Sequence, residues 1–372
     1  MPPTAHEKHL FPTLDGIRGI AAILVAMRHI PYFDSFTFPK SYLAVDLFFI
    51  LSGVVLANAY ERRLRDGMSP ATFSVLRVIR IYPLYFLGSA IGLAYWWHSG
   101  TMPPAVPVVL AFALLMLPNV TIQQPFPLNT PAWSLFSEMA ANVVFAYAIK
   151  WLSNRVIAIV AVLAALGMLA ILFVKGDLDV GYNRRTIPLG LVRVAYSFFV
   201  GIALYRLFCA RRVAIAAAGR VPAMRGTLAA WAMALLVTLV LMAKPAPSLA
   251  PAFDFVAVTL LFPALIYGAL ATRPFGRSAG VFEFLGIISY PLYAIHAPLA
   301  HWLPALAGPQ APQAGEPGAL WVGAIFLALL LPLCWLLDRY VDVPVRRALT
   351  RLVNKPRGAA RERSLAAHEG GK

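Results

Sequence analysis

Four ionisable side chains lie inside long apolar stretches of this 372-residue chain: His29, Asp46, Glu138 and His296. Such groups are rare within membrane-crossing segments, where each is a functional hypothesis by default. A neutral imidazole can remove the proton from an attacking hydroxyl near neutral pH. A nearby carboxylate would orient the imidazole and stabilise its protonated form. The four groups therefore predict a general base with carboxylate support, although polar clamps between helices would use the same residue types.

A second group of residues suited to binding is basic. Ser69 and Pro70 are typical of a helix start, and the stretch from Ala71 to Arg80 has the amphipathic pattern of a helix at the membrane interface. Arg77 and Arg80 are three residues apart, so both would lie on one face of that helix. Two guanidinium groups on one face suit phosphate binding, but the spacing alone favours anchoring to anionic lipid.

The composition indicates what kind of protein must position these residues. Hydrophobic residues make up 60% of the chain and charged residues 13%, against about 45–50% and about 25% in soluble domains. This difference indicates a membrane protein and excludes a disordered chain. Two cysteines can form one bridge at most, which excludes a disulfide-rich scaffold. The formal net charge of +16 is explained by cytoplasmic loops rich in Lys and Arg.

The apolar runs predict an all-α, polytopic membrane helix bundle. A crossing helix needs about 20 mostly apolar residues, and about ten runs approach this length. They lie near 16–32, 42–60, 81–98, 132–150, 156–174, 188–207, 227–243, 255–272, 281–303 and 318–338. A shorter run near 104–118 is bounded by prolines. We expect it to be re-entrant or peripheral, because a crossing there would place a basic loop outside.

The basic loops predict the orientation of the bundle. Arginines gather in 61–80, in 206–226 and after Arg339, and the positive-inside rule places all three groups in the cytoplasm. Both termini are then cytoplasmic. We expect residues 1–350 to form one integral-membrane domain and residues 351–372 to form a basic, disordered cytoplasmic tail. The first apolar run has no small-residue cleavage site after it, so it predicts a retained helix.

This orientation brings the four ionisable groups to similar depths in the membrane. At about 1.5 Å per residue, His29 lies roughly 16 Å from the cytoplasmic start of its helix and His296 roughly 20 Å along its own. Asp46 and Glu138 lie within about two turns of the outer ends of their helices. All four therefore fall near the middle or in the outer half of the bilayer, which favours one shared site.

Five segments resemble the signature motifs of the acyltransferase 3 family of integral-membrane acyltransferases. They are Leu14-Asp15-Gly16-Ile17-Arg18-Gly19-Ile20 with His29 eleven residues after Arg18, Val45-Asp46-Leu47-Phe48-Phe49-Ile50-Leu51-Ser52-Gly53, Arg77-Val78-Ile79-Arg80-Ile81-Tyr82-Pro83, Trp133-Ser134-Leu135-Phe136-Ser137-Glu138, and Ser289-Tyr290-Pro291-Leu292-Tyr293 followed by His296. Each motif alone is weak, but five in order over most of the chain are specific. The chain departs from the family pattern at Asp342-Val343-Pro344, where we expect no chemical role, and at Arg28 beside the candidate base.

The resemblance implies transfer of an acyl group, usually acetyl, from cytoplasmic acyl-CoA to a hydroxyl of a glycan or similar acceptor. It implies that His29 is the general base, with Glu138 or Asp46 as its partner. It assigns the CoA phosphates to Arg18, Arg77 and Arg80. The residues implied to bind substrate or to support the site are Ser137, Trp133, Ser289, Tyr293 and His296.

Other interpretations fit parts of the sequence. A transporter or flippase for a lipid-linked glycan would also need many helices and charges at mid-membrane, but it favours inverted repeats, and the sequence has none. A non-catalytic partner in polysaccharide assembly would need neither a base nor a basic pair. Trp133 is also typical of an interfacial aromatic belt, and Ser137 and Ser289 are typical of helix–helix hydrogen bonds.

The expected partners are the acyl-CoA donor, a glycan or glycolipid acceptor and membrane lipid, with no nucleic acid. No pair of His or Cys residues has the spacing of metal ligands, so we expect no metal. The resemblance and the orientation together predict a location in the bacterial inner membrane, with both termini in the cytoplasm.

Overall fold

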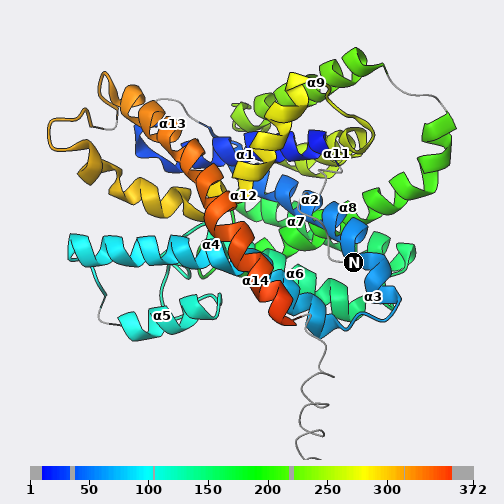
Figure 1. Cartoon of the computed structure of the whole chain (residues 1–372), viewed down its shortest axis with the longest axis horizontal. Helices are drawn as coiled ribbons and strands as arrows, with labels where there is room; N and C mark the ends of the chain where they lie inside the picture. The colour runs from blue at the N-terminus through cyan, green and yellow to red at the C-terminus, as the bar shows by residue number, and fades with distance from the viewer. Residues whose placement is uncertain (1–10, 34–37, 104, 218–221, 314, 354–372) are drawn as a thin grey trace, which may run out of the picture.

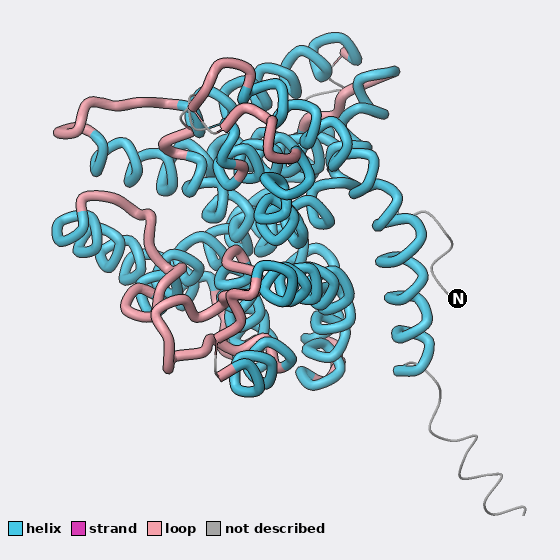
Figure 2. Tube along the Cα trace, turned by 90° about the vertical axis from the view of Figure 1, so that its left-hand side faces the viewer, coloured by secondary structure: helices cyan, strands magenta, loops and turns pink. Residues whose placement is uncertain are grey.

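The computed structural model describes residues 11–33, 38–103, 105–217, 222–313 and 315–353, and every regular element among them is helical (Figures 1 and 2). The all-α prediction is therefore confirmed. The α-helices are α1 (Pro12–His29), α2 (Ala44–Leu56), α3 (Arg62–Arg65), α4 (Pro70–Ser99), α5 (Val106–Leu114), α6 (Ala132–Ala148), α7 (Asn154–Lys175), α8 (Ile187–Ala217), α9 (Ala223–Met242), α10 (Ala250–Val256), α11 (Phe262–Ala271), α12 (Arg277–Ala307), α13 (Ala319–Leu337) and α14 (Val343–Val353). Short 3-10 or π-helical segments are η1 (Pro31–Phe33), η2 (Ser41–Leu43), η3 (Ala57–Glu61), η4 (Ala257–Leu261) and η5 (Asp338–Asp342).

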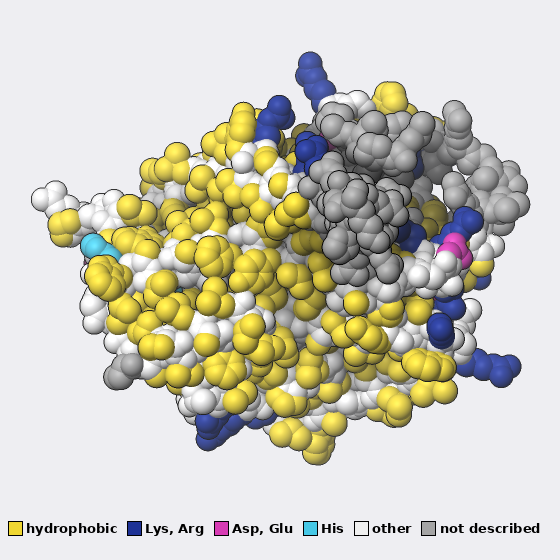
Figure 3. All heavy atoms as spheres, turned by 60° about the horizontal axis from the view of Figure 1, so that its bottom comes forward, with side chains coloured by type: hydrophobic (Ala, Val, Ile, Leu, Met, Phe, Trp, Pro, Cys, Tyr) yellow, Lys and Arg dark blue, Asp and Glu magenta, His cyan; other side chains and the backbone are white. Residues whose placement is uncertain are grey.

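Within the described ranges, eight helical stretches are long and apolar enough to cross a membrane. Two of the ten runs predicted to cross form α1, which carries Asp15, Arg18 and Arg28 in 18 residues, and α6, which has 17 residues. The count of ten crossings therefore stays a prediction. Hydrophobic side chains cover most of the described surface visible in Figure 3. Leu166 on α7 and Leu329 on α13 are large apolar side chains that are exposed, and exposed apolar surface of this kind suits contact with lipid.

Close packing of small residues determines the centre of the bundle. α1 lies along α12, and a Cβ added to Gly19 would be 2.4 Å from the carbonyl oxygen of Leu285. α2 crosses α8 in the same way, since a Cβ on Gly53 would be 2.1 Å from the carbonyl oxygen of Phe198. Glycines at such crossings let membrane helices approach closely. These two contacts bring the polar residues of α1 to α12 and those of α2 to α8.

The helix start predicted at Ser69-Pro70 is confirmed, because the Ser69 side chain accepts a hydrogen bond from the backbone N–H of Thr72. The separate interfacial helix predicted over 71–80 is wrong. Those residues continue into the next apolar run as the 30-residue helix α4, with Pro83 inside it. Phe73 near its start is fully buried. The missing N–H of one proline does not end a helix whose neighbours pack around it, so Arg77 belongs to the bundle.

The segment predicted to be re-entrant or peripheral contains α5, a nine-residue helix that is about 14 Å long and too short to cross. Its last carbonyl groups accept hydrogen bonds from α4: Tyr85 Oη donates to Ala113 O at 2.7 Å and Tyr82 Oη to Leu114 O at 2.9 Å. Tyr85 lies about 21 Å along α4 from Ser99. α5 therefore lies beside the half of α4 that ends at Ser99 (Figure 1).

The predicted tail begins inside an element. Arg351 to Val353 form the end of α14, and the rest of the tail, 354–372, lies outside the described residues. α13, η5 and α14 follow one another without a break from Ala319 to Val353. The chain therefore continues as helix beyond residue 338, where the last apolar run was expected to end, and this extension brings Asp342 toward α4.

Topology can be tested with two exposed positions on either side of α5, Thr101 and Gln123. In a variant lacking Cys209 and Cys334, we expect Thr101→Cys and Gln123→Cys both to react with a membrane-impermeant thiol reagent in intact cells, because α5 enters and leaves on one side. Labelling is measured by mass shift, with permeabilised cells as the control. Reaction of only one of the two cysteines in intact cells would mean that the segment crosses.

Candidate active site

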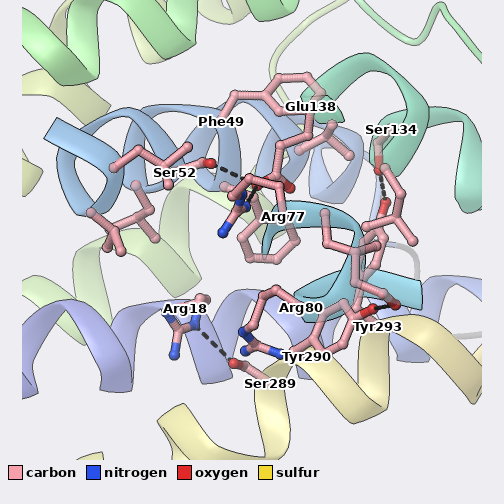
Figure 4. A pocket seen from close by; sticks show the side chains of 17 residues that line it. Arg18, Phe49, Ser52, Arg77, Arg80, Ser134, Glu138, Ser289, Tyr290 and Tyr293 are labelled. Atoms are coloured by element: carbon pink, nitrogen blue, oxygen red, sulfur yellow. Dashed lines mark hydrogen bonds and ion pairs between the residues drawn. The ribbon is translucent and has the colours of Figure 1, made fainter. Parts of the chain in front are cut away.

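A cavity of about 170 Å³ lies among five helices of the bundle (Figure 4). Its polar lining consists of Arg18 from α1, Ser52 from α2, Arg77 and Arg80 from α4, Ser134 and Glu138 from α6, and Ser289, Tyr290 and Tyr293 from α12. Apolar side chains such as Phe49 and Leu135 form the remaining wall. Three guanidinium groups against one carboxylate make the lining attractive to an anion.

Arg77 is held by a carboxylate from α6. Its Nη2 donates to Glu138 Oε1 at 2.8 Å, and Ser52 Oγ donates to the same oxygen at 2.6 Å. With its amide oxygen facing α4, Asn142 accepts a hydrogen bond from Arg77 Nε at 3.0 Å. Both side chains of the ion pair are largely buried. Glu138 is thus the counterion of a cavity arginine, and its described contacts do not include His29.

Arg80 is held by Asp342, a residue for which the sequence predicted no chemical role. Arg80 Nη1 lies 3.3 Å from Asp342 Oδ2, and Arg346 Nε lies 2.8 Å from the same oxygen. The Arg80 guanidinium also lies 4.7 Å from the centre of the Tyr290 ring, and Tyr290 Oη donates to Ile81 O. Asp342 is fully buried. Asp342 lies four residues before the basic Arg346, and this spacing was the one signal in the sequence that it acts as a counterion.

Arg18 joins α1 to α12 at the cavity. Its Nε donates to Ser289 Oγ at 2.8 Å, and its Nη2 donates to Asp15 Oδ1 at 2.9 Å. Ser289 Oγ in turn donates to Gly286 O at 2.7 Å. The hydroxyl of Ser289 is therefore occupied in orienting Arg18, which is the hydrogen-bonding role expected of serine between membrane helices.

The two candidate histidines lie side by side but outside the lining of the cavity. Their ring centroids are 5.0 Å apart, and His296 Nε2 lies 3.4 Å from His29 Nδ1. His29 is partly exposed at the end of α1, and His296 is fully buried in α12. Residues 267 positions apart in the chain are thus neighbours, as their predicted depths had suggested.

Tyr293 stands between this pair and the cavity. Its hydroxyl shares a 2.5 Å hydrogen bond with Ser134 Oγ in the cavity wall. Its ring centroid lies 5.5 Å from that of Phe48 and 5.9 Å from that of His296. One aromatic side chain therefore contacts both the cavity lining and the histidine pair.

Asp46 lies in a different polar cluster. Arg193 Nη2 donates to Asp46 Oδ2 at 2.5 Å, and Ser197 Oγ donates to Oδ1 at 3.3 Å. All three side chains are fully buried, and the Arg193 guanidinium lies 5.6 Å from the Trp133 ring centre. Ser137 Oγ donates to the backbone of Trp133 at 3.0 Å. Asp46, Trp133 and Ser137 are not part of the cavity lining.

The charge of Arg28, next to the candidate base, is balanced by a residue after α7. Arg28 Nη2 donates to Asp179 Oδ2 at 2.6 Å. Burial is the larger influence on Asp179 and raises the pKa of its carboxyl, whereas the positive charge of Arg28 acts in the opposite direction.

The structure thus divides the predicted site residues into three groups. The cavity contains Arg18, Arg77, Arg80, Glu138, Ser289 and Tyr293; the adjacent pair is His29 and His296; the separate cluster contains Asp46, Trp133 and Ser137. Their predicted catalytic and binding roles stay predictions. In the part of the chain that the structure describes, no group of three or more His, Cys, Asp or Glu residues could hold a metal ion.

The sequence profile of a family described as an acyltransferase domain matches residues 11–339. The chain belongs to the acyltransferase 3 family. It is therefore an integral-membrane acyltransferase that transfers groups other than aminoacyl groups. The matched region includes all the predicted site residues.

Two relatives extend this finding. "Protein 2 in picA locus" of Rhizobium radiobacter is 37% identical over 179 residues, which are 43% of this chain and 94% of the relative. Acyltransferase MdmB of Streptomyces mycarofaciens is 32% identical over 164 residues, which are 39% of this chain and 40% of MdmB. The aligned part thus spans less than half of MdmB. No solved structure matches the chain.

The buried ion pair of Asp46 leads to a prediction that distinguishes a structural role of this residue from a catalytic one. We expect Asp46→Asn or Arg193→Met alone to lower the free energy of unfolding by about 3–5 kcal/mol, because each leaves a buried partner uncompensated. The double variant Asp46→Leu with Arg193→Met should recover most of that loss. Thermal unfolding of the purified variants measures both the loss of stability and its recovery. A double variant that folds but transfers no acyl group would instead support the predicted catalytic role of Asp46.

Proposed function

We propose that this acyltransferase moves an acyl group, acetyl in the first instance, from cytoplasmic acyl-CoA to a hydroxyl of a cell-surface glycan or lipid-linked sugar in the bacterial inner membrane. The observation that carries the proposal is that α1 and α12 each contribute to both the arginine-lined cavity and the histidine pair. α1 provides Arg18 and His29, and α12 provides Ser289 and His296.

The spacing along these helices suits the shape of the donor. CoA carries its phosphates at one end and its thioester at the end of a long flexible arm. Arg18 and His29 are separated by about 16 Å of helix, and Ser289 and His296 by about 10 Å. Phosphates bound at the arginines would therefore leave the arm to extend along α1 and α12 toward His29.

The arginines suit an anionic donor for a further reason. A guanidinium group has five N–H donors in a planar fork, and forked donors bind phosphate oxygens in pairs. Glu138 and Asp342 offset the charges of Arg77 and Arg80 and orient their guanidinium groups in a largely apolar environment. The exposed Arg62 lies on α3, which directly precedes the end of α4 that carries Arg77 and Arg80. We assign this end to the cytoplasm by the positive-inside rule.

In the proposed reaction the acceptor approaches from the opposite end. His29 removes the proton from the acceptor hydroxyl, and the resulting oxygen attacks the carbonyl carbon of the thioester. The carbon–sulfur bond then breaks, CoA leaves as a thiolate, and the proton held by His29 returns to that thiolate. One ester forms and one thioester is lost, so no other reactant is required.

Acyl transfer and the role of His29 as the general base can be tested together. Purified protein given radiolabelled acetyl-CoA and bacterial membrane glycan should label the glycan. His29→Ala should lower kcat about 10²- to 10⁴-fold, the range for loss of a general base. His98→Ala, a change at an exposed histidine of α4, is the matched control and should keep full transfer. A folded His29→Ala protein with wild-type kcat would exclude this base.

Donor binding has its own test. Arg77→Gln with Arg80→Gln keeps a hydrogen-bond donor toward Glu138 and Asp342 but removes both charges. We expect the KM for acetyl-CoA to rise about 10²- to 10⁴-fold, because each arginine loses a charge-assisted hydrogen bond that contributes about 1.5–3 kcal/mol.

The matched control for donor binding removes two exposed charges from the same end of the bundle, with Arg62→Gln and Arg63→Gln. This control should leave the KM unchanged, and initial rates over a range of acetyl-CoA concentrations measure both variants. An unchanged KM in the Arg77/Arg80 variant would leave lipid anchoring as the role of the pair.

A further inference from the structure

The hydrogen bonds around His296 determine which of its ring nitrogens carries the proton. His296 Nδ1 lies 2.9 Å from Leu292 O and 3.0 Å from Tyr293 O. A carbonyl oxygen only accepts hydrogen bonds, so a proton on Nδ1 satisfies both contacts, whereas a lone pair there would be repelled by them. In the neutral ring, Nε2 is then unprotonated and can accept a hydrogen bond.

The same reasoning applies to His29. Its Nδ1 lies 2.8 Å from Val25 O, which again requires the proton on Nδ1. That N–H lies 3.4 Å from the unprotonated Nε2 of His296, so it has two acceptors, one on its own helix and one on α12. The Nε2 of His29 is left without a proton, and this is the atom that a general base needs.

The carboxylates that could have oriented the His29 ring have other partners. Glu138 accepts from Arg77 and Ser52. Asp46 accepts from Arg193 and Ser197 in a separate cluster. Asp179, on the loop after α7, pairs with Arg28. The side chain that does contact the Nδ1 of His29 is a second imidazole.

We propose that His296 is the positioning residue of the candidate base: its Nε2 accepts the Nδ1–H of His29 and so fixes the ring with its bare Nε2 toward the acceptor hydroxyl. The proposal rests on the proposed function, in which His29 is the base. It gives a buried neutral imidazole the place that a carboxylate takes in a Ser–His–Asp arrangement.

A neutral partner has a specific consequence. When His29 takes the proton of the acceptor at its Nε2, the imidazolium still donates from Nδ1 to His296, and His296 keeps its own proton on Nδ1. The pair therefore holds one extra proton during the reaction. A second extra proton on the pair would place two positive charges about 5 Å apart in a buried site, which is strongly unfavourable. His29 can then return its proton to the thiolate without competition from its partner.

The test compares two replacements of His296. Phenylalanine fills the ring volume but has no acceptor, whereas glutamine has an amide oxygen that can accept from His29. We expect His296→Phe to lower kcat about 10- to 100-fold, the range found when the hydrogen-bond partner that orients a metal-bound imidazole is removed. The KM for acetyl-CoA should not change, and His296→Gln should restore kcat to within several-fold of wild type. His98→Phe, at an exposed histidine of α4, is the control and should keep wild-type kcat.

A second readout requires no substrate. In protein labelled with ¹⁵N-histidine, the Nδ1–H proton of His29 should resonate at a similar position in the wild type and His296→Gln, and should shift in His296→Phe, where Val25 O is the one acceptor left of the two. A wild-type kcat together with an unmoved resonance in a folded His296→Phe protein would overturn the proposal, while loss of transfer in His29→Ala would still support the proposed function. Conversely, a wild-type protein with the expected resonance but no transfer from acetyl-CoA would overturn the proposed function alone.

Discussion

The approach of α1 to α12 is the constraint on which both polar groups of the site depend. Gly19 leaves so little space beside Leu285 that an added Cβ would overlap its backbone. Hydrogen bonds need donor and acceptor within about 3.5 Å, and three side-chain contacts of the described residues cross this interface, including one from Arg18 to the carbonyl oxygen of Gly286. Arg18 reaches Ser289 near one end, and His29 reaches His296 near the other. A larger residue at Gly19 would therefore pull apart both the Arg18–Ser289 contact at the cavity and the His29–His296 contact.

Much of the fold could be predicted because the length of each apolar run and the positions of the prolines determine locally where a helix forms. The ten apolar runs and the start of α4 at Ser69 all correspond to helices. The partners of the charged groups could not be predicted in the same way. Depth follows from counting residues along a helix, but the direction of a side chain around the axis depends on packing. Glu138 and Asp46, for example, turn toward Arg77 and Arg193.

Asp342 illustrates the same limit at the end of the chain. Its sequence context departs from the family pattern, and the last apolar run was expected to stop near residue 338. The helix instead continues through η5 into α14, with Arg339, Arg347 and Arg351 exposed along it. Asp342 is buried between Arg80 and Arg346. Asp342 therefore helps to hold Arg80 in the cavity wall. A search for motifs alone would miss this role.

The counterions also explain how a cavity in a membrane protein can keep three arginines ready for an anion. A buried guanidinium without a partner is costly, and Asp15, Glu138 and Asp342 each offset one of them. These ion pairs use only part of the five donors that each arginine has. The orientation of the remaining donors is fixed before any ligand arrives, so binding requires little further ordering. Because the carboxylates also reduce the net positive charge, an anion that bound at this cavity would be recognised by the geometry of the hydrogen bonds more than by long-range attraction.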